Sequence, residues 1–153
     1  MLYGLALLAG IVAGSRTSTA LAAVSWAARL GYLDLDGSWL AFMGYAWTPW
    51  IFTLLAFVEY VTDQLPSTPS RKVPMQFGAR VVSGALSGAT VGTSAGSWVA
   101  GLIAGVIGAV IGTYGGAEIR ARMARAFGRD TPAAFIEDAA AVILGLVIIW
   151  ALR

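Results

Sequence analysis

Trp98-Val-Ala-Gly-Leu-Ile-Ala-Gly-Val-Ile-Gly-Ala-Val-Ile-Gly-Thr-Tyr114 is the stretch that decides the fold. It carries no charge, and its glycines recur at spacing four, at Gly101 and Gly105 and again at Gly108 and Gly112. A helix needs about 20 apolar residues to cross a bilayer core, and small residues at this spacing let helix backbones approach closely in lipid. The stretch therefore predicts a central, packed membrane-spanning helix, although the same glycines would also suit a dimer face.

Four further segments are comparably apolar. They run over about Leu2 to Leu30 with an interruption near residues 14–17, Trp39 to Leu65, Val73 to Gly92, and Pro132 to Leu152. The whole chain is 58% hydrophobic and 12% charged, whereas soluble domains average about 25% charged residues. The sequence predicts an all-α protein, a polytopic transmembrane helical bundle of about five spans. Residues 1–153 would form a single integral membrane domain, with Thr48-Pro49 starting the true second span.

Tryptophan and basic residues sort to opposite ends of these segments. The basic side consists of the loops 67–75 and 120–130, which hold Arg71, Lys72, Arg120, Arg122, Arg125 and Arg129. The positive-inside rule places these loops in the cytoplasm, so the N-terminus is expected inside and the C-terminus outside. The six tryptophans all fall toward the other side, where interfacial anchoring explains them.

Several function classes are disfavoured by composition. The chain has no Cys and no His, so it lacks thiol chemistry, the commonest general base and the preferred transition-metal ligands. Its basic residues are interpreted as topology signals, and no nucleic-acid partner is expected. We expect no metal, no cofactor and no enzymatic activity. A membrane enzyme acting on lipid phosphates has little support without a phosphate motif.

Short matches suggest an internal repeat. Residues 10–15 resemble residues 108–113, and residues 56–59 resemble residues 134–137. Repeat 1 would cover about 1–65 and repeat 2 about 98–152, joined by a linking span at about 73–92. One extra span inverts the second half, as in many secondary transporters. Both first segments are expected to break after a Gly-x-x-x-Gly, which points to a transporter site or, equally, to a packing kink.

Ionisable residues within the spans are the candidate substrate-binding or ion-binding residues. They are Glu59, Asp63, Glu137, Asp138, Arg16, Arg80 and Thr17. Charges at such depth are costly unless they are paired or hydrated, so we expect the four carboxylates to converge with Arg80 on the cytoplasmic half. They could form structural ion pairs, or a cytoplasm-facing cavity that binds a cation or carries a proton. The helix start at Arg16 could alternatively hold an anion.

Two loops have further distinctive chemistry. The connection from Asp63 to Arg71 contains two prolines, which predict a rigid, extended path. Residues 120–129 predict a short basic helix on the inner membrane surface, where anionic lipid would contact Arg120, Arg122, Arg125 and Arg129.

The chain resembles a bacterial family of small integral membrane proteins catalogued as a domain of unknown function (number 4126). The matching pieces are Arg16-Thr17, residues 59–71, Arg80 with Gly84-Ala85 and Gly88-Ala89, residues 112–116, and Glu137-Asp138. Gln64 stands where the family pattern leads us to expect Lys. The resemblance implies a location in the bacterial inner membrane and no established activity.

Two hypotheses for function follow. The first is a small secondary transporter or channel for an ion or solute, with a homodimer favoured because five spans make a thin wall. The second is a non-transporting membrane subunit, assembly factor or lipid-binding scaffold. A hydrated crevice that reaches Glu59 and Glu137 would favour the first, and a dry, ion-paired core would favour the second.

Overall fold

The computed structural model describes residues 1–65 and 70–153. Over these residues the chain has six α-helices, one short 3-10 helix and no strand, which confirms the all-α expectation. The elements are α1 (Leu2–Ser15), α2 (Thr17–Arg29), η1 (Ala41–Gly44), α3 (Thr48–Thr62), α4 (Pro74–Ser94), α5 (Trp98–Phe127) and α6 (Asp130–Leu152). The prolines of the expected rigid connection, Pro66 and Pro69, lie outside the described residues.

The helix boundaries follow local chemistry. Pro49 and Pro74 stand in the first turns of α3 and α4, where the missing N–H costs nothing. The Ser97 side chain accepts a hydrogen bond from the Ala100 amide at 3.2 Å and so caps α5. Gly128, with φ of 67°, ends α5 in a left-handed conformation that glycine adopts readily. α6 then returns beside α5.

Arginine and tryptophan side chains gather toward opposite ends of the molecule. We call the end that holds Arg16, Asp63, Arg71 and Arg120 the arginine end. The opposite, tryptophan end holds the loop 31–47 and Trp98, where the rings of Trp39 and Trp98 lie 5.8 Å apart.

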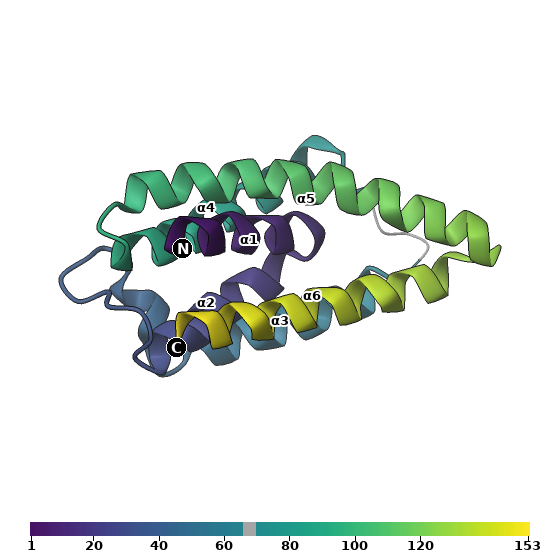
Figure 1. The fold of residues 1–153 in the computed structure, drawn as a ribbon. Coiled ribbons are helices and arrows are strands. Elements are labelled where there is room, and N and C mark those ends of the chain that lie inside the picture. Colours follow the sequence, from purple (N-terminus) through teal and green to yellow (C-terminus); the bar gives the residue numbers. More distant parts are fainter. Residues whose placement is uncertain (66–69) are drawn as a thin grey trace.

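The helices α1 and α2 form a hairpin instead of one span. α1 starts at the tryptophan end, where the Tyr3 hydroxyl donates to the Ala95 carbonyl at 3.1 Å, and α2 returns to that end from the tip at Arg16. Both termini therefore lie at the tryptophan end (Figure 1). The expected placement of the N-terminus and the C-terminus on opposite sides is corrected, because the first apolar segment turns back at Arg16.

The core is a glycine-lined packing of α1, α4 and α5, and α5 is its centre. A Cβ atom added at Gly88 would lie 2.3 Å from the Gly101 carbonyl oxygen, and one at Gly10 would lie 2.2 Å from the Gly105 carbonyl oxygen. Only glycine permits such backbone contact. The prediction that α4 and α5 pack centrally is confirmed, and the stripe that could have been a dimer face is used within one chain.

The proposed inverted repeat is not supported. Gly10 lies against Gly105 and Gly14 lies against Ala109, so α1 and α5 run in the same direction. An inverted repeat requires opposite directions for these two segments. The expected second break is also absent, because α5 continues as one helix from Trp98 to Phe127. Gly112 has a packing role instead, since a Cβ there would lie 2.1 Å from the Ile11 carbonyl oxygen.

Two helices, α5 with 30 residues and α6 with 23, are long and apolar enough to cross a membrane. α1 and α3 are apolar but contain only 14 and 15 residues. α4 has 21 residues but carries Arg80 and several hydroxyl side chains. The structure thus provides two candidate spans and does not confirm five.

Candidate functional site

The break between α1 and α2 is the starting point of the site. Arg16 has extended backbone angles (φ −136°, ψ 103°), so the last carbonyls of α1 and the first amides of α2 lack helical partners. Glu59 on α3 accepts hydrogen bonds from the Thr17 and Ser18 amides, both at 2.8 Å. Its negative charge also suits the positive end of the α2 dipole. The anion expected at this helix start is therefore a side chain of the protein.

The carbonyl side of the break is capped from two other helices. Arg80 on α4 donates to the Gly14 and Ser15 carbonyl oxygens at 3.2 and 2.7 Å. Thr113 on α5 donates to the same Gly14 oxygen at 3.2 Å. A cation and a hydroxyl group at a helix C-terminus satisfy its free carbonyls and its dipole.

The Arg16 side chain is fully buried and reaches three carboxylates. Its Nε donates to Asp138 Oδ1 at 2.5 Å, its Nη1 pairs with Asp63, and its Nη2 lies 3.6 Å from Glu137 Oε2. Because a buried guanidinium is strongly destabilising without partners, these contacts tie the hairpin tip to α3 and α6.

Glu137 is shared among three arginines. Arg71 donates to its two oxygens at 2.5 and 2.8 Å, a bidentate arrangement. Arg120 lies 3.3 Å from Glu137 Oε2 and also holds Asp130 through bonds of 3.0 and 2.6 Å. A Cβ added at Gly116 would lie 3.2 Å from Arg71 Nη1, so glycine leaves the room that this pair occupies.

The structure brings all seven candidate binding residues together at the arginine end. Among the described residues, Arg16, Arg71 and Arg120 pair with Asp63, Glu137 and Asp138, and beside them Arg80 and Glu59 cap the broken ends of α1 and α2. We call these eight side chains the charge cluster. The cluster carries no surplus of negative charge, because Arg16, Arg71 and Arg120 join Arg80 and balance the four carboxylates.

Sequence reasoning missed the role of Arg71, and it considered Arg120 only as one possible balancing charge for the carboxylates. Arg71 was interpreted as a topology signal, and Arg120 was expected to contact lipid at the membrane surface. Arg120 instead turns inward to Asp130 and Glu137. The only sequence signal for this pairing was the surplus of carboxylates over arginines within the spans.

The expected short basic helix at residues 120–129 is not a separate element, because residues 120–127 are the final part of α5 and Arg129 lies at the start of α6. Arg122 and Arg125 on α5 and Arg129 before α6 are exposed. Arg122 Nε lies 2.8 Å from Glu118 Oε1, and Arg125 Nη2 lies 3.8 Å from the same oxygen. These solvent-facing pairs contribute little to stability, which leaves the three guanidinium groups accessible to other anions.

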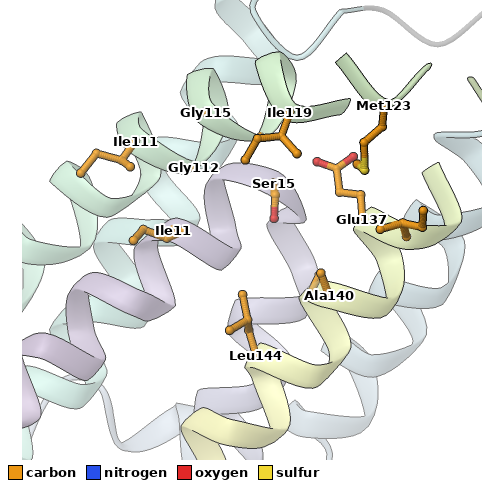
Figure 2. A pocket seen from close by; sticks show the side chains of 13 residues that line it. Ile11, Ser15, Ile111, Gly112, Gly115, Ile119, Met123, Glu137, Ala140 and Leu144 are labelled. Atoms are coloured by element: carbon orange, nitrogen blue, oxygen red, sulfur yellow. The ribbon is translucent and has the colours of Figure 1, made fainter. Parts of the chain in front are cut away.

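A groove of about 300 Å³ borders the cluster between α1, α5 and α6. Glu137 and Ser15 lie at its polar edge, and most other lining residues are aliphatic or glycine (Figure 2). Glu59 does not line it. Among the described residues, no group of three His, Cys, Asp or Glu side chains is placed to hold a metal ion.

The site is thus a set of ion pairs and helix caps that joins α1, α2, α3, α4, α5 and α6. No protein-family model matches the chain, and neither a curated protein nor a solved structure matches it.

Proposed function

We propose that this chain is a multi-pass membrane protein that acts as a non-transporting, lipid-binding scaffold or subunit. The observation that carries the proposal is the fully buried Arg16, whose guanidinium contacts three carboxylates. A transporter needs groups that exchange their partners during the cycle. Here each carboxylate of the charge cluster already has an arginine or a helix end as its partner.

A membrane setting is supported by the outward faces of the outer helices. Leu54, Phe57 and Val61 on α3 are each more than half exposed, as are Ile143, Leu146 and Trp150 on α6. In water such patches would be unusually large, whereas lipid covers them without cost. The resemblance to the family numbered 4126 supports the same location.

The broken segment fits this setting too. Irregular backbone at membrane depth is tolerated only where protein or water satisfies its polar groups. Arg16 lies inside the protein, with both flanking helix ends capped. We therefore propose that α1 and α2 form a re-entrant hairpin that enters from the tryptophan side. By the positive-inside rule the arginine end would face the cytoplasm, and both termini would lie outside.

A transporter or channel for a small ion or solute remains the second candidate. It is favoured by the groove beside Glu137 and by Arg16 Nη2, which is buried and has no hydrogen-bond partner among the described residues. A polar ligand or water at this place would satisfy that nitrogen.

Flux through proteoliposomes tests the proposal, with ion panels run on the wild type, Glu59→Gln and Glu118→Gln. Glu118 is an exposed glutamate outside the charge cluster and serves as the matched control. We expect no flux above empty vesicles for any of the three. Glu59→Gln should lower the melting temperature, because the Thr17 and Ser18 amides lose a charged acceptor. Flux that Glu59→Gln abolishes at an unchanged melting temperature would establish the transporter instead.

A further inference from the structure

We propose that the groove between α1, α5 and α6 holds one acyl chain of an anionic phospholipid. Its phosphate would lie against Arg122 and Arg129 at the tip of the α5–α6 hairpin. This inference rests on the proposed lipid-binding function and names the lipid class and the place where it binds.

The lining of the groove is suited to a hydrocarbon chain. Aliphatic side chains from three helices form it, namely Ile11, Ile111, Ile119, Met123, Ile136 and Leu144. Figure 2 shows Ile11 and Ile111 toward one end of the groove and Met123 beside Glu137 at the other. Gly112 and Gly115 line the α5 wall between Ile111 and Ile119 and add no side chain to it. The groove is partly open and not an enclosed cavity, so a lipid can enter it laterally.

The dimensions favour a single chain over a helix. Along α5 the lining extends from Ile111 to Met123, which is about 18 Å at 1.5 Å per residue. One leaflet of the hydrocarbon core is about 15 Å thick, half of the ~30 Å total. A volume of about 300 Å³ over that length corresponds to a mean cross-section of roughly 17 Å². A whole helix about 10 Å across would need roughly 80 Å², so the groove matches one hydrocarbon chain better than an inserted helix.

Charge identifies the headgroup. The groove ends near Met123 and Ile136, next to the hairpin tip that holds Arg122 and Arg129. Between residues 118 and 130, four arginines stand against Glu118 and Asp130, a surplus of two positive charges. Basic residues at the membrane surface attract anionic lipid. A phosphate at this position would be reached by Arg122, which its exposed pair with Glu118 holds only weakly.

The lipid would also protect the charge cluster. Glu137 borders both the groove and the three arginines that hold it. An acyl chain in the groove excludes water from this side of the carboxylate, and removal of water strengthens its ion pairs.

Glycine supplies a matched pair of variants. A Cβ added at Gly115, which lines the groove, meets no atom within 4 Å, so Gly115→Leu starts its side chain in open space and is designed to fill the groove. Gly78 on α4 is equally open but is not a lining residue, so Gly78→Leu is the control. Ala140→Leu blocks the groove from the α6 wall and provides a second, independent test.

Native mass spectrometry measures the phospholipid that stays on each chain after detergent purification and exposure to phosphatidylglycerol. We expect one retained lipid on the wild type and on Gly78→Leu. Gly115→Leu and Ala140→Leu should each retain about tenfold less, the effect of losing about two buried methylene groups. Equal retention in all variants, no lipid on the wild type, or equal loss from Gly78→Leu would overturn the inference, as would a copurifying peptide in place of lipid.

The headgroup is tested by Arg122→Gln combined with Arg129→Gln, with Arg153→Gln at the other end as the control. The double variant should lose most of the preference for phosphatidylglycerol over phosphatidylcholine with the same acyl chains, and the control should keep it. An unchanged preference would refute the phosphate contact.

Flux in proteoliposomes distinguishes a failure of the proposed scaffold function from a failure of the proposed lipid site. Measurable flux would overturn the scaffold function, whichever lipid is bound. If the wild type retains no lipid and shows no flux, only the proposal that the groove binds a lipid is overturned.

Discussion

Replacing Gly88 by alanine tests the close contact of α4 with α5. The added Cβ would lie 2.3 Å from the Gly101 carbonyl oxygen and 2.8 Å from the Gly105 Cα, whereas ordinary contacts begin at 3.4 Å. The neighbours are backbone atoms, so no side-chain rotation relieves the clash. The helices must separate by about 1 Å, the difference between 3.4 and 2.3 Å, and the glycine contacts along the interface are weakened.

Two effects of this substitution oppose each other. Alanine favours a helix over glycine by about 1 kcal/mol. Overpacking costs about 1–3 kcal/mol and occasionally more. Because the neighbours of the added Cβ are rigid backbone atoms, we expect a cost at Gly88 near the upper end of that range. We therefore expect a net loss of about 2 kcal/mol. This corresponds to a melting temperature lower by about 4–8 °C, at 2–4 °C per kcal/mol for a chain of this size.

Thermal unfolding followed by circular dichroism in detergent measures the effect. Gly78→Ala is the matched control. Gly78 lies on the same helix as Gly88, but a Cβ added there meets no atom within 4 Å. The control should melt at or slightly above the wild-type temperature, and Gly88→Leu should melt below Gly88→Ala. If Gly88→Ala melts with the control, α4 does not contact α5 at this glycine and the packing described above is wrong.

Other predictions concern topology and the charge cluster. The chain has no cysteine, so single cysteines at Gly4 and Asp36 should react with an impermeant reagent from one side of sealed vesicles and a cysteine at Ser70 from the other. Reaction at Gly4 from the Ser70 side would refute the re-entrant hairpin. Glu137→Gln should destabilise the protein by about 3–5 kcal/mol, because three buried or partly buried arginines lose a charged partner. Glu118→Gln, at an exposed pair, should change stability by less than about 1 kcal/mol in the same unfolding assay, and equal effects would show that Glu137 is not held as described.

The glycine spacing and the sorting of tryptophan from arginine predicted the central helices and the two ends of the molecule. They could do so because both signals are local in sequence. The glycines of α4 and α5 lie in the helices that they pack, and each tryptophan marks the end at which it stands. The convergence of the carboxylates also followed from their depth, since each entered its helix from the same end.

The hairpin at Arg16 was not predictable in the same way. Residues 2–30 contain enough apolar residues for one span, and the turn depends on Glu59 and Arg80, which cap the broken ends from 42 and 66 residues away. The repeat failed for a related reason. Short Gly-x-x-x-Gly motifs indicate close helix packing. Because such packing occurs between parallel as well as antiparallel helices, the motifs do not predict the relative direction of two helices.

The most direct test of the closed charge cluster is a double-mutant cycle on Arg16 and Asp138, measured by equilibrium unfolding. Arg16→Met and Asp138→Asn would be made singly and together. The pair is buried and joined at 2.5 Å, so we predict a coupling free energy between about 0.5 and 3 kcal/mol, the range of residues in one network. A coupling of no more than a few tenths of a kcal/mol would contradict a structural cluster and return these residues to the role of a ligand site.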